Sequence, residues 1–137
     1  MGKFNIYLEK ISGKRLRETG LNSEKGRKAL VESGKILAKM HNAGIAHGDF
    51  TPANLILSKN KVYIIDFGLA SLSTDIEEKA VDVLLMEKSI SKKDFISFLK
   101  GYKNYKEWKK VLKHVEEIKK RGRYQVRAEE KEEIEEE

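Results

Sequence analysis

Apolar residues recur at helical spacing in four segments of the chain, and this pattern predicts a mainly α-helical protein. The first segment runs from residue 23 to 42 and is followed by Gly44, a residue common at helix ends. The second, residues 77–88, is apolar on most of its sides, as expected of a buried helix. The third starts with a capping box at Ser91, and the fourth starts at about residue 105.

A short β-hairpin is predicted in the middle of the chain. Two apolar runs rich in β-branched residues, 55–57 and 62–65, flank the polar residues 58–61. The two ends of a hairpin lie side by side. We therefore expect Asn54, just before the first strand, to lie next to Asp66, just after the second.

Polar residues at the base of this hairpin indicate a possible chemistry. Asp49 precedes Asn54 by five residues, and Asp66 opens the sequence Asp-Phe-Gly. An amide oxygen and a carboxylate are hard ligands that suit Mg²⁺ carrying the phosphates of a nucleotide. Asp49 would then orient a nucleophile or accept its proton. The alternative is a surface loop without chemistry, against which the order and spacing of the three residues argue.

Two further polar residues fall in apolar surroundings. Asp82 lies in the middle of the segment 77–88, where a buried carboxylate without partners would be costly. It either lies on an exposed edge of the helix or accepts hydrogen bonds from another segment. His41 falls on the apolar face of the first helix, so we expect it to be packed in the core rather than to be a ligand.

The order of the motifs resembles the protein-kinase signature, in which a histidine-x-aspartate loop with its asparagine is followed by Asp-Phe-Gly. The sequence His47-Gly48-Asp49, in place of His-Arg-Asp, is similar to several atypical kinases. These are the aminoglycoside and choline phosphotransferases, the RIO kinases and the KEOPS-complex kinase (PRPK family). The sequence EKAVDVLLMEKSI, which starts at Glu78, and KRGRY near the C-terminus look like the KEOPS kinase. This resemblance extends to about Arg127.

The resemblance implies a kinase-like C-lobe in residues 1–128, mainly α with a small β-hairpin and lacking the N-lobe. No Gly-x-Gly-x-x-Gly loop and no strand with a phosphate-binding lysine precede the catalytic loop. Residues from about 3 to 13 match the hinge segment, and residues from about 119 to 128 form a basic C-terminal tail. We expect residues 119–124 to break the last helix, and the acidic tail 129–137 to be a solvated helix or disordered.

The resemblance also implies roles for residues around the hairpin. Asp49 would be the catalytic aspartate. Asn54 and Asp66 would be magnesium ligands and would contact the nucleotide through the metal. His47 and Asp82 would support the catalytic loop, with Asp82 accepting backbone N–H groups of that loop.

Residues near the two ends of the chain receive roles by the same resemblance. Glu9 and Ile11 lie in the hinge segment, whose backbone would meet the adenine of ATP. Arg121, Arg123 and Tyr124 belong to the basic tail, which in this family reaches toward a partner subunit.

The family that the sequence resembles is a small kinase/ATPase. It supports the KEOPS threonylcarbamoyl transferase in making threonylcarbamoyladenosine on tRNA. The resemblance therefore implies ATP and Mg²⁺ as cofactors and the transferase subunit and tRNA as partners. It also implies that a small lobe or a partner absent from this chain completes the ATP site.

Three departures from typical serine/threonine kinases favour ATP hydrolysis by water over protein phosphorylation. Gly48 replaces the arginine that would pair with a phosphorylated activation loop. Thr51 stands where those kinases keep a lysine for the transferred phosphate. Only 16 positions separate Asp66 from Asp82, which leaves little platform for a peptide substrate.

The charge of the chain is unevenly distributed. The chain holds 28 basic and 22 acidic residues, a formal net charge of +6. The last nine residues hold seven glutamates and one lysine, so the rest of the chain has 27 basic and 15 acidic residues and a balance of +12. Such a body is expected to attract polyanions, with RNA and nucleotide phosphates as candidates. Solvated lysines on helix surfaces are the alternative.

Composition excludes several other classes of function. The chain has no cysteine, which excludes disulfide and thiolate chemistry, and its three histidines are scattered, so we expect no zinc site. No apolar run approaches the length of a membrane span and no signal peptide opens the chain, so we expect a cytoplasmic protein with no membrane partner.

Two other functions stay open beside the kinase/ATPase. The first is a non-catalytic docking module for the KEOPS transferase subunit and tRNA, favoured by the basic body and the tail from Arg121 to Arg127. The second is a fragment of a small-molecule phosphotransferase. Only 69 residues follow Gly68, which is little room for the helical substrate subdomain of those enzymes.

Overall fold

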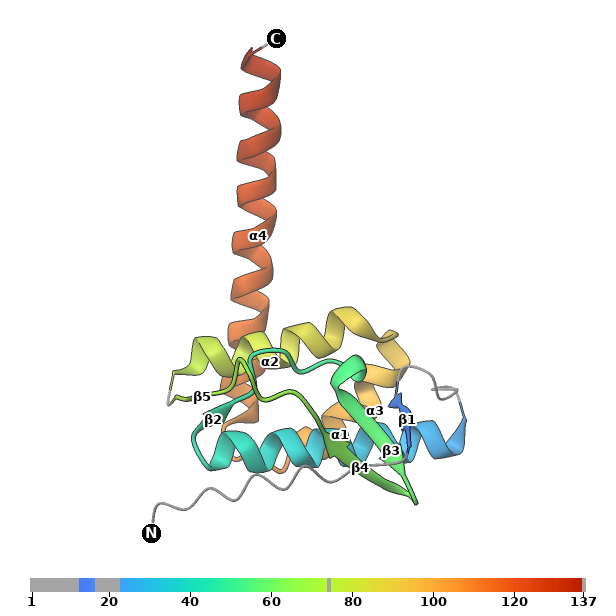
Figure 1. Cartoon of the computed structure of the whole chain (residues 1–137). Helices are drawn as coiled ribbons and strands as arrows, with labels where there is room; N and C mark the ends of the chain where they lie inside the picture. Colours follow the sequence, from blue (N-terminus) through green and yellow to red (C-terminus); the bar gives the residue numbers. More distant parts are fainter. Residues whose placement is uncertain (1–12, 17–22, 74, 137) are drawn as a thin grey trace.

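The computed structural model describes residues 13–16, 23–73 and 75–136, without the side chains of Lys14 and of residues 123–136. Most of this part of the chain is helical (Figure 1). Its helices are α1 (Glu24–Asn42), α2 (Ile76–Ser89), α3 (Lys92–Tyr102) and α4 (Trp108–Glu136), with a 3₁₀ turn, η2 (Pro52–Asn54). The prediction of a mainly α protein with a small hairpin is confirmed.

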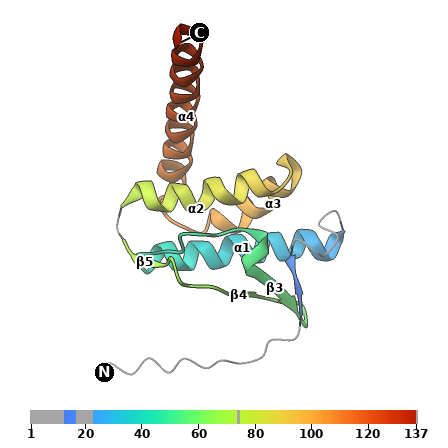
Figure 2. The same ribbon diagram turned by 45° about the horizontal axis from the view of Figure 1, so that its top comes forward.

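Two small antiparallel sheets complete the described fold. Their strands are β1 (Lys14–Arg15), β2 (Ile45–Ala46), β3 (Leu55–Ser58), β4 (Lys61–Ile64) and β5 (Ser71–Leu72). The first sheet has the order β1-β3-β4, and the second pairs β2 with β5. Figure 2 shows α1 between the row of α2 and α3 on one side and the hairpin β3–β4 on the other.

The predicted hairpin is present as β3 and β4, with Leu55 opposite Ile64 and Ser58 opposite Lys61. The two turn residues, Lys59 and Asn60, both have positive φ angles, of 49° and 64°. Such φ angles are typical of the type I′ turn, whose twist matches that of the two strands. The hairpin is therefore closed by the tightest connection that two antiparallel strands commonly use.

Helix α1 begins and ends at the residues that its sequence predicts. The hydroxyl of Ser23 accepts a hydrogen bond from the backbone N–H of Gly26 at 3.0 Å and so caps the first turn. After Asn42 the chain leaves the helix, and Gly44 takes a left-handed φ of 74°. A left-handed residue just past a helix end is most often glycine, because it has no Cβ to clash.

Helices α1 and α3 cross at very short distance because each has a glycine at the contact. A Cβ atom on Gly34 would lie 2.0 Å from the carbonyl oxygen of Phe98, and one on Gly101 would lie 1.9 Å from that of Val31. Atoms cannot approach so closely, so only glycine allows the two backbones to meet here. This crossing fixes the position of α3 over the middle of α1.

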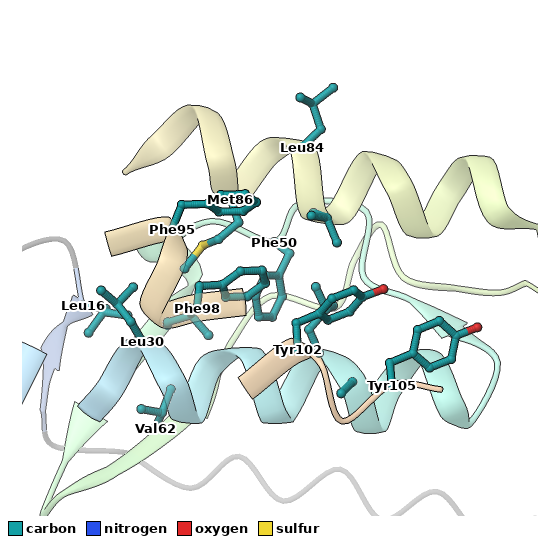
Figure 3. Packing of buried hydrophobic residues seen from close by; sticks show 14 of the residues in the cluster. Leu16, Leu30, Phe50, Val62, Leu84, Met86, Phe95, Phe98, Tyr102 and Tyr105 are labelled. Atoms are coloured by element: carbon teal, nitrogen blue, oxygen red, sulfur yellow. The ribbon is translucent and has the colours of Figure 1, made fainter. Parts of the chain in front are cut away.

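A ladder of aromatic rings, most of them from α3, fills the core between α1 and α2 (Figure 3). The ring centroids of Phe95 and Phe98 are 5.8 Å apart, those of Phe98 and Tyr102 are 6.0 Å apart, and Tyr105 follows Tyr102 at 5.9 Å. Phe50, from the loop after β2, lies against Phe98 at 6.2 Å. Stacked and tilted pairs at these distances add about 0.5–1.5 kcal/mol each beyond the burial of their area.

Helix α4 differs from the prediction. It begins at Trp108 and continues without interruption to Glu136, so the predicted break at residues 119–124 is wrong. Gly122 costs a helix only about 1 kcal/mol relative to alanine, and the Lys, Arg, Glu and Ala residues around it favour the helix. The C-terminal part of α4 projects away from the other elements (Figure 1). In the described ranges, none of the helices is long and apolar enough to cross a membrane.

Replacing Gly34 or Gly101 by alanine should lower the free energy of unfolding by about 1–3 kcal/mol or more, because the added methyl group forces the two helices apart. The matched control is Gly122→Ala, where no atom lies within 4 Å of the new Cβ. That substitution should leave stability unchanged or raise it by up to about 1 kcal/mol. Urea unfolding followed by circular dichroism measures all three, and equal effects at the three positions would contradict the close crossing.

Candidate functional site

The candidate catalytic loop connects β2 to β3 and carries three of the predicted residues, His47, Asp49 and Asn54. Phe50 is buried in the aromatic core and holds the middle of the loop down. Pro52 is also buried and stands at the start of the 3₁₀ turn η2, where its fixed φ angle suits the first helical position. The loop is therefore anchored between its two polar ends.

Asp49 and Asn54 are in direct contact. The side-chain amide of Asn54 donates from Nδ2 to the carboxylate Oδ2 of Asp49 at 2.9 Å and to its backbone carbonyl at 2.8 Å. Both bonds use the nitrogen of the amide, which leaves its oxygen Oδ1 as an acceptor with no hydrogen bond among the described residues. The geometry thus turns an oxygen of Asn54 away from Asp49 and makes it available to a cation.

Asp66 follows β4 at the same end of the hairpin. The backbone N–H of Ile65 donates to the carbonyl of Asn54 at 2.9 Å, so the strand pairing continues up to the residue before Asp66. Asp66 has a left-handed φ of 62°, a costly conformation for a residue other than glycine. Its carboxylate is exposed and accepts only the N–H of Gly68, at 3.2 Å, in the described part of the chain. The hairpin brings the backbones of Asn54 and Asp66 together as predicted.

Asp82 lies at the centre of α2 with no exposed surface and accepts hydrogen bonds from three groups. The backbone N–H groups of His47 and Gly48 donate to its two oxygens at 2.8 and 2.9 Å, and the ring nitrogen Nε2 of His41 lies 2.9 Å from Oδ2. These are the hydrogen bonds expected of a residue that supports the catalytic loop. Three donors compensate the cost of burying the carboxylate.

No residue larger than glycine fits at position 48 in this arrangement. Its φ is 92°, and a Cβ atom there would lie 2.5 Å from the carbonyl oxygen of Leu69. The segment after Asp-Phe-Gly therefore lies directly against the catalytic loop. An arginine in place of Gly48 would push Leu69 and the strand β5 away from β2.

His47 links the catalytic loop to the end of the hairpin. Its ring is buried, its Nδ1 accepts the backbone N–H of Asp49 at 3.1 Å, and its Nε2 lies 3.4 Å from the carbonyl oxygen of Ile65. The neutral ring protonated at Nε2 satisfies both contacts. The ring of Phe67 covers His47 with 5.4 Å between the two centroids. His47 thus connects the positions of Asp49 and Asp66.

His41 is buried as predicted, but the sequence did not reveal its contacts. Its Nδ1 lies 2.7 Å from the hydroxyl of Tyr102, which donates to it when Nε2–H donates to Asp82. Burial lowers the pKa of His41 below its usual value of 6.5, and the charge of Lys79 adds to this, while Asp82 opposes it. Burial also raises the pKa of Tyr102, which keeps its hydroxyl protonated. The neutral imidazole fits both partners.

The sequence does contain one signal of this hydrogen-bond network, namely that its three side chains lie on apolar helix faces. His41 and Tyr102 are polar residues on the apolar faces of α1 and α3, and Asp82 has the same kind of position on α2. One polar residue on each of three facing apolar stripes suggests a shared buried cluster. The sequence alone does not show that the three faces meet.

Other predicted residues lie elsewhere or outside the described part. Glu9 and Ile11 are outside the described residues, as is most of the hinge segment. Arg121 lies on α4 and forms an ion pair with Glu77 of α2. Hydrogen bonds from His114 and from Arg121 lower the pKa of Glu77. Arg123 and Tyr124 belong to α4, and their side chains are outside the described set.

The donors present fit a magnesium ion that arrives with a nucleotide. Within the described ranges, no three His, Asp or Glu side chains lie close enough to hold a metal by themselves. Mg²⁺ in nucleotide sites needs only one or two protein ligands, since phosphates and waters supply the others. The free Oδ1 of Asn54 and the exposed carboxylate of Asp66 would supply those two ligands.

The fold and the loop together define a kinase-like C-lobe, and comparisons with known proteins agree. The sequence model of the lipopolysaccharide kinase (Kdo/WaaP) family matches residues 8–102. The chain therefore belongs to this family of kinase-like proteins.

Curated relatives show which kinase-like proteins the chain resembles. The chain is 37% identical over 135 residues to the KEOPS complex subunit Bud32 of Pyrococcus abyssi, a match that covers 90% of this chain and 61% of the relative. It is 36% identical over 126 residues to a probable serine/threonine-protein kinase Bud32 homolog of Archaeoglobus fulgidus, with 87% and 62% covered. It is 38% identical over 132 residues to a probable bifunctional tRNA threonylcarbamoyladenosine biosynthesis protein of Methanosphaera stadtmanae, with 90% and 24% covered.

These matches confirm the resemblance to the KEOPS-complex kinase that the motifs predict. The chain spans about three fifths of the length of the two Bud32 relatives and about a quarter of the bifunctional one.

Because His41 is buried and neutral, we expect the free energy of unfolding to depend on pH. Below about pH 6.5 the unfolded chain binds a proton at His41, whereas the folded chain binds it only at a lower pH, because the pKa is lowered there. The free energy of unfolding that depends on this residue is therefore fully present above about pH 6.5 and decreases as the pH falls further. Urea unfolding between pH 7.5 and 5.5 should show this loss, at up to about 1.4 kcal/mol per pH unit. His41→Gln should flatten the profile, because the glutamine side chain does not titrate. A steeper slope in His41→Gln would contradict the neutral assignment.

Proposed function

We propose that this chain is the large lobe of a Bud32-type kinase/ATPase. In this proposal it hydrolyses Mg-ATP in support of tRNA threonylcarbamoyladenosine formation within a KEOPS complex. The observation that carries the proposal is the hydrogen bond between Asn54 Nδ2 and Asp49 Oδ2, at 2.9 Å. It joins the proposed catalytic residue to a proposed metal ligand in a fixed orientation.

The chain's own residues would orient the attacking water and hold the loop that carries Asp49. The carboxylate of Asp49 is held by Asn54 on one oxygen, which leaves the other oxygen to orient the attacking water and to accept its proton. Asp82 and His47 hold the loop backbone, so Asp49 does not need to reorganise during the reaction. Asn54 and Asp66 would hold Mg²⁺. When bound, Mg²⁺ neutralises the charge that develops on the phosphates.

Water is the proposed acceptor of the phosphoryl group. The contact between Gly48 and Leu69 leaves no space for the arginine that would pair with a phosphorylated activation loop. Between Asp66 and the start of α2 at Ile76 there are only nine residues, and part of them pairs with β2. Little surface remains there to hold a peptide beside Asp49.

The proposed partners follow from the names of the relatives. One relative is a KEOPS complex subunit, and another is named for tRNA threonylcarbamoyladenosine biosynthesis. We extend these associations to this chain, with the threonylcarbamoyl transferase subunit and tRNA as partners. The projecting part of α4, which holds Arg123 and Tyr124, is the segment proposed to reach the transferase (Figure 1).

The test is release of phosphate from Mg-ATP by the chain together with a KEOPS transferase subunit. Asp49→Asn should lower kcat by about 10²–10⁴, since it removes the group that accepts the proton. Asp66→Asn should abolish turnover and weaken binding of Mg-ADP measured by calorimetry, because it removes a negatively charged ligand. Neither variant should lose much stability, because Asp66 is exposed and Asp49 is only partly buried.

The matched control is Asp75→Asn, the same chemical change at an exposed position. Asp75 caps α2 by accepting the N–H of Glu77 at 3.0 Å, and asparagine caps a helix equally well. Turnover and Mg-ADP affinity should therefore equal those of the parent chain. Full turnover in Asp49→Asn or in Asp66→Asn would contradict the assignment of the site.

A further inference from the structure

A basic groove lies where α1 crosses α3. It has a volume of about 420 Å³ and lies between the N-terminal half of α1 and the face of α3 near its end. The charged residues that line it are Arg27, Lys28 and Lys35 with Glu24 and Glu32 on α1, and Lys100 on α3. None of the residues that line the groove belongs to the candidate site, so the two are separate.

The groove exists because the two helices cross so closely. A Cβ atom on Gly101 would lie 2.7 Å from the backbone nitrogen of Lys35. Lys35 and Lys100 are therefore next to the crossing point, one on each helix. Their long side chains line the two sides of one hollow. Cations from two elements thus face the same space.

The groove has an excess of positive charge, since four basic residues line it against two glutamates, Glu24 and Glu32. Glu24 lies 3.6 Å from the ammonium of Lys28, an exposed pair of little energetic value. Over the described ranges, no carboxylate lies within 4.0 Å of the basic groups of Arg27, Lys35 or Lys100. Like charges held together in a hollow repel each other unless an anion binds between them.

The spacing of these cations suits a polymer better than a single anion. Arg27 and Lys35 are eight residues apart on α1, which is about 12 Å along the helix axis. One phosphate cannot contact both, whereas successive phosphates of a chain can. The lining residues include no aromatic side chain on which a base could stack. Recognition here would therefore address the backbone and not the sequence.

We propose that this groove between α1 and α3 binds the phosphate backbone of RNA. The choice of RNA rests on the proposed function, because a chain that acts in tRNA modification meets tRNA, and on the excess of 12 positive charges in the body of the chain. The lining of the groove shares no residue with the candidate nucleotide site, so RNA and Mg-ATP bind at the same time. Each ammonium or guanidinium group displaces a counterion from a phosphate, which makes the affinity fall with salt.

The test is a titration of fluorescein-labelled tRNA transcript with the full chain, followed by anisotropy at several salt concentrations. The variant Arg27→Glu/Lys35→Glu/Lys100→Glu should bind at least about tenfold more weakly, with a salt slope smaller by about 2–3. The matched control is Lys93→Glu/Lys106→Glu/Lys113→Glu, an equal charge change at exposed positions outside the groove. Its affinity should change less than about threefold. The milder variant Arg27→Gln/Lys35→Gln/Lys100→Gln should show the same order if charge reversal perturbs folding.

Equal losses in the groove variant and the control would overturn the proposal, since only general charge would then matter. Unchanged affinity in the groove variants would overturn it as well. The competing occupant is the glutamate-rich end of α4 from a second copy, and it predicts loss of self-association in sedimentation with unchanged RNA affinity. Mg-ATP turnover should be equal in parent and groove variants. A failure of the proposed function would appear in turnover and a failure of the groove in RNA affinity, so the two are distinguishable.

Discussion

The arrangement of the candidate site depends on one buried carboxylate. Asp82 lies in the middle of α2 and accepts hydrogen bonds from the backbone N–H groups of His47 and Gly48 and from the ring of His41. Charge-assisted hydrogen bonds away from water are strong, and loss of one partner leaves a costly buried charge. Helix α1, helix α2 and the loop are therefore held at a single point. Asp49 and Asn54 take their positions from that point, because they follow in the same loop.

The features that the sequence predicted are local in the chain. The hairpin requires only two apolar runs and a polar turn, and the cap of α1 requires only Ser23 and the next three residues. The proximity of Asn54 and Asp66 could also be predicted, because the hairpin alone brings its two ends together. Short-range geometry of this kind depends little on the rest of the fold.

The features that the sequence did not predict depend on contacts between distant segments. His41 and Tyr102 are 61 residues apart, and no local pattern shows that they share a hydrogen bond. The crossing at Gly34 and Gly101 likewise becomes visible only when α1 and α3 are placed together. The error in α4 has a different origin. A glycine among basic residues resembles a helix break, but the surrounding residues favour the helix strongly enough to continue it.

Asp82 holds the candidate catalytic loop in place, and amide hydrogen exchange of His47 and Gly48 tests this role most directly. Both amides should exchange slowly in the parent chain, because each donates to the buried carboxylate. In Asp82→Asn one oxygen becomes a donor, so at least one of the two amides should exchange about 5–100 times faster, while the amides of α3 change much less. Fast exchange of both amides in the parent chain, or equal rates in parent and variant, would contradict the account.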